Sequence, residues 1–390
     1  MRRISRLVAT CSTLVAFLSL PAVAGAAGPV KIGIVNSMTG PEAPIGEQLT
    51  NGFKLAQEDL KAEGLDVQFQ WEDDSGKPQV SMTAVEKLAT REGVCGIVGP
   101  YSSSAGNAAA KVAERYHVPL LVPLAAKDEI TRQGFKWVFR LAPTTADRAR
   151  ALVDMAVALG RPRTLAILNE NTDFGVSVAR SVKAAAEKKG LRIVFEEAYS
   201  KGSPDYRSTL VKLKNAHPDL VFMGSYVVDA ILLMRQSREV GLSPMAFLGA
   251  GAGFAMTQFA QEKAISEDVL SSTEWAPDVA WPGAKAWAAR FQKRFGVPPT
   301  YHASGAYESA MIMGRAIGKA GCDRARIRQA LVGGHWTGIT GDVSFQNFDG
   351  YTNQNRQVML VQQVVDGHHV TVWPPEHAVR KAVWPFPGWR

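Results

Sequence analysis

Short apolar runs rich in β-branched residues alternate with longer amphipathic stretches along most of the chain. The runs are typical of buried strands, and the stretches between them repeat apolar positions at helical spacing. This alternation predicts βαβ units on parallel sheets. The predicted strands are 30–35, 67–71, 94–98, 118–122, 137–141, 164–168, 191–196, 220–223 and 245–248. The predicted helices between them are 46–63, 80–89, 103–116, 147–159, 174–189, 206–215 and 230–240.

The pattern starts a second time near residue 137, which predicts two doubly wound α/β domains in tandem. The length of 390 residues agrees with two domains, at about 150 residues each. After Trp275 the pattern is less regular, with helices predicted at 283–295 and 303–320 and strands at 342–345 and 357–365. This tail is too short for a third domain, so we expect it to complete the first two.

The N-terminus carries the features of a secretory signal. Three arginines precede a charge-free apolar stretch at 7–20, and small residues follow at 21–27. A signal peptide over 1–27, cleaved between Ala24 and Ala27, is therefore predicted, and an uncleaved anchor helix is the disfavoured alternative. Cleavage removes three arginines and no acid, so the formal net charge falls from +8 to +5. We expect an exported, periplasmic protein whose diffuse positive charge does not indicate nucleic-acid binding.

Composition and motifs argue against several classes of protein. The 46% hydrophobic and 21% charged fractions exclude a disordered or collagen-like chain. Cys95 and Cys322 are interpreted as buried free thiols, with a disulfide between them left open. The chain has no Gly-x-Gly-x-x-Gly after its first strand, no Gly-x-Ser-x-Gly and no His-Glu-x-x-His. We therefore predict no cofactor, no metal site, including at the His368–His369 pair after a hairpin turn, and no enzyme activity.

The loop Gly99-Pro100-Tyr101-Ser102-Ser103-Ser104-Ala105-Gly106 lies where a buried strand ends and a helix begins. A helix N-terminus presents unpaired N–H groups, and serine hydroxyls add donors, so the loop suits a small carboxylate or phosphate. The alternative is that one serine only caps the helix. The loops 124–126, 171–175 and 224–226 also follow strands, and ligands of open parallel sheets bind at such carboxyl ends. In two facing domains these loops would line one cleft.

Taken together, the motifs resemble type I periplasmic solute-binding proteins of the branched-chain amino-acid receptor branch, with its aromatic-acid-binding subgroup. The stretches that carry the resemblance are 30–33, 39–41, 51–52, 98–104, 118–123, 138–141 and 173–175. The resemblance implies two lobes that close on a ligand, joined by crossovers near Pro143, Trp275 and Gly350. Lobe 1 would comprise 28–143 and 276–350, and lobe 2 would comprise 144–275 and 351–390. The implied partner of this monomer is an inner-membrane ABC permease with a cytoplasmic ATPase.

The resemblance also implies a site. Ser103 matches the family's carboxylate-binding serine, flanked by Tyr101, Ser102 and Ser104, and the backbone of Leu124, Ala125 and Ala126 completes this half. The family's ammonium partners are missing: Ala126 replaces a threonine, Phe174 an aromatic hydroxyl and Gly251 an acid. The remaining predicted ligand-binding positions are Ile45, Ala252 and Tyr226, which matches a tyrosine in the second lobe of the family.

A buried ammonium without partners costs several kcal/mol, which predicts a carboxylate ligand without an α-amino group. An aromatic or hydrophobic acid, such as a benzoate or a phenylpropenoate, fits this pattern. If the alignment shifts, Glu262 or Glu274 becomes the acid. A branched-chain amino acid or an amide then remains open as the ligand. An enzyme and a signalling receptor domain are weaker alternatives.

Overall fold

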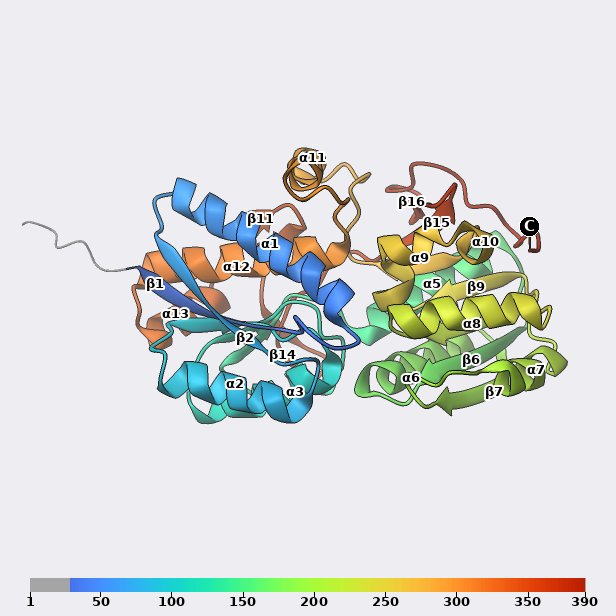
Figure 1. The fold of residues 1–390 in the computed structure, drawn as a ribbon, viewed down its shortest axis with the longest axis horizontal. Coiled ribbons are helices and arrows are strands. Elements are labelled where there is room, and N and C mark those ends of the chain that lie inside the picture. The colour runs from blue at the N-terminus through green and yellow to red at the C-terminus, as the bar shows by residue number, and fades with distance from the viewer. Residues whose placement is uncertain (1–28, 390) are drawn as a thin grey trace, which may run out of the picture.

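The computed structural model describes residues 29–389 and contains two seven-stranded sheets, one in each of two lobes that lie side by side (Figure 1). The predicted leader lies outside the described residues. Within them, no helix combines the length and hydropathy that a bilayer crossing requires. The predicted α/β class and the two-lobe architecture are confirmed.

Lobe 1 begins with five strands in βαβ succession, as the alternating pattern predicts. Its first part contains β1 (Val30–Asn36), α1 (Ala43–Ala62), β2 (Val67–Asp73), α2 (Pro78–Thr90), β3 (Gly96–Val98), α3 (Ser103–Arg115), β4 (Leu120–Val122), α4 (Glu129–Arg132) and β5 (Val138–Arg140). Its second part contains α11 (Ala284–Phe295), α12 (Tyr301–Ala320), α13 (Arg324–Val332), β11 (Trp336–Gly338), β12 (Gly341–Val343), β13 (Gln346–Phe348) and β14 (Tyr351–Gln354). The sheet order is β13-β14-β5-β4-β3-β1-β2, and β11 pairs only with β12.

Lobe 2 repeats this design and is completed by the C-terminal hairpin. It contains α5 (Thr145–Leu159), β6 (Thr164–Glu170), α6 (Asp173–Lys188), β7 (Arg192–Tyr199), α7 (Arg207–Asn215), β8 (Leu220–Gly224), α8 (Val227–Glu239), β9 (Ala246–Gly249), η1 (Ala252–Ala255), α9 (Thr257–Gln261), α10 (Lys263–Ser266), β10 (Leu270–Thr273), β15 (Leu360–Val365) and β16 (His368–Trp373). The order is β16-β15-β10-β9-β8-β6-β7, and helices cover both faces of the sheet (Figure 1).

The chain passes between the two sheets three times. It does so between β5 and α5, between β10 and α11, and between β14 and β15. The expected third crossover near Gly350 is wrong, because Gly350 lies in the turn between β13 and β14, with φ +79°. Strand β14 then pairs with β5, Gln354 opposite Arg140, so the chain leaves lobe 1 only after Gln354.

Cys95 and Cys322 form a disulfide, so the interpretation of free thiols is wrong. Cys95 directly precedes β3, and Cys322 lies between α12 and α13. The bond therefore joins the two sequence-distant parts of lobe 1.

Candidate functional site

Loops at the carboxyl ends of strands from both lobes meet between the sheets, and two ion pairs join them. Lys201, which follows β7, lies with its Nζ 2.7 Å from Oε1 of Glu42, which precedes α1. Lys127, which follows β4, lies with its Nζ 2.8 Å from Oδ1 of Asp173 at the start of α6. Opposite charges thus connect the lobes at two places.

The serine loop divides its roles between two neighbouring residues. The Ser102 hydroxyl caps α3 by accepting a hydrogen bond from the Ala105 N–H at 3.4 Å. The Ser103 hydroxyl oxygen instead accepts from the backbone N–H groups of Ala126 at 3.1 Å and Lys127 at 3.2 Å. The capping role and the binding role that the sequence left open are therefore compatible. Ser103 and two backbone donors converge beside the N-terminus of a helix, which favours an anion.

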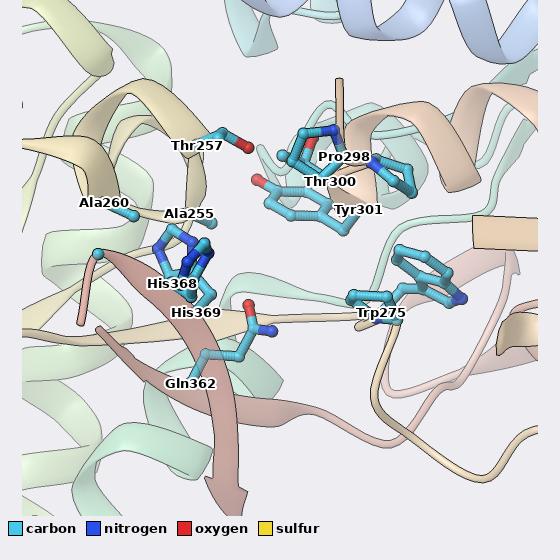
Figure 2. Close-up of a pocket in the computed structure, with 13 residues that line it drawn as sticks. Ala255, Thr257, Ala260, Trp275, Pro298, Thr300, Tyr301, Gln362, His368 and His369 are labelled. Carbon is cyan, nitrogen blue, oxygen red and sulfur yellow. The ribbon is translucent and has the colours of Figure 1, made fainter. Parts of the chain in front are cut away.

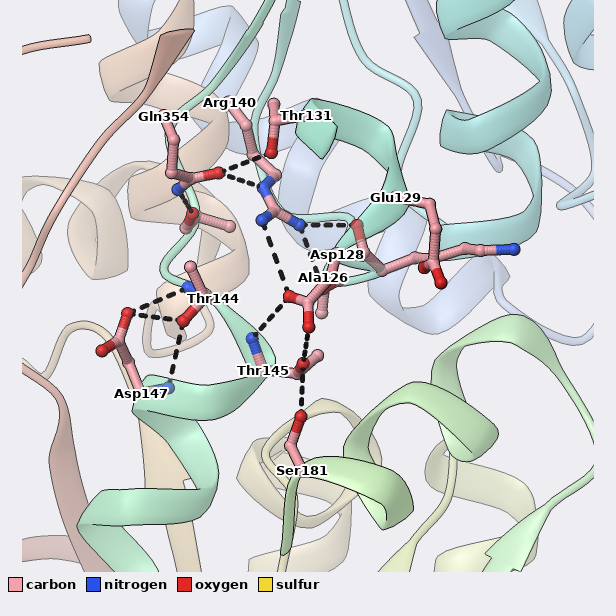
Figure 3. A network of polar contacts seen from close by, with 12 residues as sticks. Ala126, Asp128, Glu129, Thr131, Arg140, Thr144, Thr145, Asp147, Ser181 and Gln354 are labelled. Carbon is pink, nitrogen blue, oxygen red and sulfur yellow. Dashed lines mark hydrogen bonds and ion pairs between the residues drawn. The ribbon is translucent and has the colours of Figure 1, made fainter. Parts of the chain in front are cut away.

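Arg140 holds the loop that carries these donors (Figure 3). Its fully buried guanidinium donates through Nη1 to the carbonyls of Ala126 at 3.0 Å and Lys127 at 2.7 Å, and through Nε to Gln354 Oε1 at 2.6 Å. Burial lowers the pKa of Arg140 to about 10, so the group stays cationic at neutral pH. The Ala126 carbonyl shares a trans peptide unit with the Lys127 N–H, so its contact with Arg140 directs that N–H toward Ser103. Neither Arg140 nor Gln354 was identified from the sequence.

A second polar chain in the same region crosses from lobe 1 to lobe 2 (Figure 3). The Thr145 hydroxyl, at the start of α5, donates to Asp128 Oδ2 at 2.8 Å and lies 2.8 Å from the Ser181 hydroxyl. These contacts hold the start of α5, where the chain first enters lobe 2, next to the loop whose Ala126 and Lys127 N–H groups contact Ser103.

Three aromatic rings from different loops are packed together between the lobes. Phe174 and Tyr226 are stacked, with ring centroids 5.2 Å apart and planes at 29°. The ring centroid of Tyr101 lies 5.9 Å from that of Tyr226. The Tyr101–Tyr226 ring contact connects the lobe 2 aromatic pair to the serine loop of lobe 1. The predicted residues Tyr101, Ser103, Phe174 and Tyr226 thus come together in space.

The Glu170 carboxylate holds the backbone of Tyr226 in place. Its Oε2 accepts the Tyr226 N–H at 3.2 Å, and its Oε1 accepts the Thr172 hydroxyl at 2.5 Å. Burial raises the pKa of Glu170 to about 7. One carboxyl thereby fixes the starts of both α6 and α8, which carry the aromatic pair.

The other predicted residues differ in how they are placed. Ile45, Leu124, Ala126 and Ala252 are buried in the same apolar cluster as the three rings. Ala125 lies in a different cluster, in the core of lobe 1, where its Cβ packs against Gly106. Ser104 lies one residue further along α3 and is half-buried. Only the backbone of Ala125 lies in the site loop, because its side chain packs into the core of lobe 1.

Gly251 faces a cation where the resemblance implies an acid. A Cβ at Gly251 would lie 2.9 Å from the Ser272 carbonyl oxygen, 3.1 Å from Arg148 Nη1 and 3.4 Å from the Tyr301 hydroxyl. The Arg148 guanidinium is paired through Nη2 with Glu274 Oε1 at 2.8 Å, and both side chains are buried, at 3% and 5% exposure. Glu274 follows β10 at the carboxyl edge of the sheet. Of the two acids the sequence left open, Glu262 is exposed and lies near Arg235 instead.

Tyr301 and His302, at the start of α12, connect this ion pair to the serine loop. The Tyr301 hydroxyl accepts the Ala252 N–H at 2.8 Å, and the His302 ring is stacked on that of Tyr301 with centroids 3.9 Å apart. His302 Nε2 lies 3.5 Å from the Tyr101 hydroxyl. Burial, with the nearby Arg148 charge, holds the pKa of His302 well below its usual range, so the ring is neutral.

Tyr301 also lines a cavity of about 140 Å³ (Figure 2). Its other walls include Trp275, Gln362 and the β15–β16 hairpin with His368 and His369. The turn at Asp366–Gly367 confirms the predicted hairpin. His369 Nε2 is 2.8 Å from the Phe254 carbonyl oxygen, and residues 29–389 contain no group of three or more His, Cys, Asp or Glu arranged to hold a metal ion.

The comparisons with known proteins agree with this architecture. A family model described as periplasmic binding protein matches residues 29–368. The chain belongs to this family. A Leu/Ile/Val-binding protein homolog from Brucella suis is 30% identical over 382 residues, which cover 92% of this chain and 95% of the relative.

Solved structures of other binding proteins have the same fold. A leucine-binding protein from Thermotoga maritima is similar with a TM-score of 0.80 at 21% identity, over 89% of this chain and 99% of its own. An ABC transporter solute-binding protein from R. palustris, solved in complex with benzoate, has a TM-score of 0.80 at 18% identity, over 88% of this chain and 95% of its own. The resemblance drawn from the sequence is therefore confirmed.

Proposed function

We propose that this family member is the substrate-binding protein of an ABC uptake transporter. In this role it is exported to the periplasm, binds a small carboxylate between its lobes and presents the closed form to an inner-membrane permease with a cytoplasmic ATPase. The protein carries ligand and performs no chemistry on it. A ligand promotes closure only through contacts that differ between the open and closed states, and the interlobe placement of the candidate site provides such contacts.

The observation that carries the ligand class is the Arg148 guanidinium beside Gly251. An α-ammonium group needs an acceptor or a carboxylate when it is buried. Here the position of that acid is a glycine, its neighbour is a cation, and the acid within reach, Glu274, is already paired with that cation. A ligand ammonium beside Gly251 would have the Arg148 cation as a neighbour and only the Ser272 carbonyl oxygen as an acceptor, with no uncommitted carboxylate. The site therefore favours a carboxylate without an α-amino group.

The carboxylate end of such a ligand fits the serine loop. The backbone N–H groups of Ala126 and Lys127 both donate to the Ser103 hydroxyl oxygen. A ligand carboxylate that displaced the Ser103 oxygen from these donors would accept from them and from the hydroxyl. Charge-assisted hydrogen bonds of this kind are about twice as strong as neutral ones.

The remaining walls favour a flat apolar body. The Phe174 and Tyr226 rings are stacked on each other with their planes at 29°, which makes this wall aromatic, and Ile45 and Leu124 are aliphatic. Aromatic pairs add roughly 0.5–1.5 kcal/mol beyond the burial of their area. A benzoate or a phenylpropenoate satisfies both the apolar walls and the anion-binding loop. The name of the Brucella relative supports the alternative, a branched-chain amino acid or an amide.

Calorimetry with matched ligands tests the proposal. We expect 3-phenylpropanoate to bind at least tenfold more tightly than phenylalanine, since the two differ only in the α-amino group. Benzoate should also bind, and leucine should not. Tighter binding of phenylalanine or leucine would overturn the assignment and support the amino-acid alternative. Mass spectrometry of ligand released from the purified native protein provides an independent check of the class.

A further inference from the structure

Glu308 is a buried carboxyl in lobe 1 that takes no part in the interlobe site. It lies on α12 and has 0% exposure. Its Oε2 accepts the Thr340 N–H at 3.3 Å, whereas its Oε1 has no hydrogen-bond partner in the described part of the chain. Buried polar groups are nearly always hydrogen-bonded, so the unpartnered oxygen points to a donor that the chain itself does not supply.

The Glu308 carboxyl lines a cavity of about 190 Å³. The cavity lies between α12, the β11–β12 hairpin and the segment that joins β10 to α11, and Tyr307, Met311 and Ile339 give it apolar walls. Gly338 of the hairpin also lines it, and a Cβ there would overlap both carboxylate oxygens. The glycine thus allows the carboxylate to lie against the hairpin. The volume far exceeds what a single water molecule needs.

The helices around the cavity supply Glu308 with no counter-charge of its own. Arg315 also lines the cavity, but its Nη2 lies 2.6 Å from Glu63 Oε1 on α1. Asp59 of α1 is paired with Arg290 of α11. Burial raises the pKa of Glu308 to about 7, an effect that the nearby Arg315 charge opposes. The carboxyl therefore loses its proton near neutral pH, and its negative charge is then left over among these pairs.

The hairpin and the far end of α12 do not supply the missing charge either. Asp342 Oδ1 lies 3.6 Å from His335 Nε2, and both side chains are exposed. Lys319 lies with its Nζ 4.5 Å from the centroid of the Trp336 ring. It follows Glu308 by 11 residues on α12, about 16 Å along the helix axis. The cavity therefore suits a group that brings both a hydrogen-bond donor and a positive charge to Glu308.

We propose that this cavity in lobe 1 is a second ligand site, which binds a small organic cation with N–H donors, a primary ammonium or a guanidinium, on the Glu308 carboxylate. An N–H group supplies the donor that Oε1 lacks, and the charge compensates the ionised carboxylate. Charge-assisted hydrogen bonds of this kind are about twice as strong as neutral ones. Tyr307, Met311 and Ile339 accommodate a short alkyl chain. The site is separate from the interlobe site and does not depend on the function proposed for it.

Calorimetry with propylammonium chloride, at constant ionic strength, tests the site. We expect one-to-one binding at pH 7.5 and at least tenfold weaker binding at pH 5.5, where Glu308 is largely protonated. Glu308→Gln keeps the size of the side chain and removes the charge, so binding at pH 7.5 should weaken at least tenfold and lose its pH dependence. Tetramethylammonium has the same charge but no N–H donor, and it should bind the unchanged protein at least tenfold more weakly than propylammonium.

Asp342→Asn is the matched control, because it neutralises an exposed acid of the same hairpin and should change the affinity less than twofold. If Glu308→Gln does not fold, proton release decides the question in the unchanged protein. Binding at pH 6.5 should release most of one proton, measured from the heats in buffers of different ionisation enthalpy. The site is overturned by absence of saturable binding at pH 7.5, by binding that Glu308→Gln leaves unchanged, by equal affinities for the two cations, or by binding without proton release.

Discussion

The Lys201 ammonium and the Glu42 carboxylate join the two lobes, with 2.7 Å between Nζ and Oε1. The carboxylate is buried at 4% exposure, and the ammonium also lies 4.5 Å above the Tyr226 ring. The burial that raises the pKa of Glu42 is opposed by this same lysine. The pair is therefore a contact between the lobes, and its ammonium lies against one ring of the candidate site.

Lys201→Met should favour the open arrangement and weaken ligand binding. Loss of the cation leaves the Glu42 carboxylate buried without its partner, at a cost of about 1–3 kcal/mol, or roughly five- to 150-fold in affinity. Small-angle scattering of the ligand-free protein and calorimetry measure the two effects. Lys183→Met is the matched control, because Lys183 and Glu196 are 2.7 Å apart within lobe 2 and both are exposed. Equal effects of the two variants would argue against an interlobe role.

Ser103→Ala and Ser102→Ala should separate binding from capping. Ser103→Ala is expected to weaken ligand binding by about 1–3 kcal/mol, through the loss of a hydroxyl next to the ligand carboxylate. Ser102→Ala removes the cap of α3 and should lower the free energy of unfolding by about 1 kcal/mol. Calorimetry and urea unfolding on both variants check the split. A reversed result would place the carboxylate on Ser102.

Glu308 should make the protein less stable as the pH rises. This carboxyl is fully buried in α12, its Oε1 has no hydrogen-bond partner in the described part of the chain, and burial raises its pKa to about 7. A carboxyl whose pKa is higher in the folded state holds its proton more tightly there than in the unfolded chain. Its contribution to stability is therefore present below about pH 4.5 and is lost as the pH rises to about 7.

Glu308→Gln should remove this dependence. We expect similar free energies of unfolding at pH 5, and a variant that is more stable than the unchanged protein by about 1–3 kcal/mol at pH 7.5. Urea unfolding at both values measures the difference, in which the contributions of Glu170 and His302 cancel. Glu47→Gln, on the exposed side of α1, is the control. A pH dependence unchanged by Glu308→Gln contradicts the assignment.

Gln354→Leu should destabilise the lobe junction. The buried amide accepts from Arg140 Nε at 2.6 Å and from the Thr131 hydroxyl at 2.9 Å, and it donates to the Ala142 carbonyl at 2.7 Å. Leucine leaves a buried guanidinium N–H unpaired, so the free energy of unfolding should fall by about 2–4 kcal/mol. Urea unfolding measures this, with the exposed Gln133→Leu as control. A loss below about 0.5 kcal/mol, typical of surface substitutions, would contradict the role of the amide.

Much of the fold and one half of the site follow from the sequence. The β-branched runs predict the first strands of each sheet, and the serine loop predicts a site at Ser103, because local periodicity and helix-end chemistry are properties of short segments. The sequence could not assign different roles to Ser102 and Ser103. That distinction depends on the partner loop at Ala126 and Lys127, which the tertiary fold brings within hydrogen-bond distance.

The sequence pattern does not indicate that Arg148 and Glu274 lie in the site, and the reasons are physical. Strand β10 has the sequence Leu-Ser-Ser-Thr and is buried on both faces without an apolar run, so Glu274 at its end carries no strand signal. Arg148 lies in the first turn of an amphipathic helix, where arginine normally indicates a solvated face. Strand β14, with the sequence Tyr-Thr-Asn-Gln, is equally polar, so the sequence does not predict it as a strand of lobe 1. The third crossover was therefore expected too early in the chain.

The Cys95–Cys322 bond makes the three connecting segments topologically unequal. The segments 141–144 and 274–283 lie inside the covalent ring that the disulfide closes, and 355–359 lies outside it. A protease that cuts either of the first two leaves fragments that remain joined through sulfur. A cut in 355–359 leaves the β15–β16 hairpin attached to lobe 2 only by its hydrogen bonds and packing. Cleavage in either of the first two connecting segments thus leaves the chain covalently joined. Cleavage in 355–359 is the cut after which lobe 2 can lose its terminal strands.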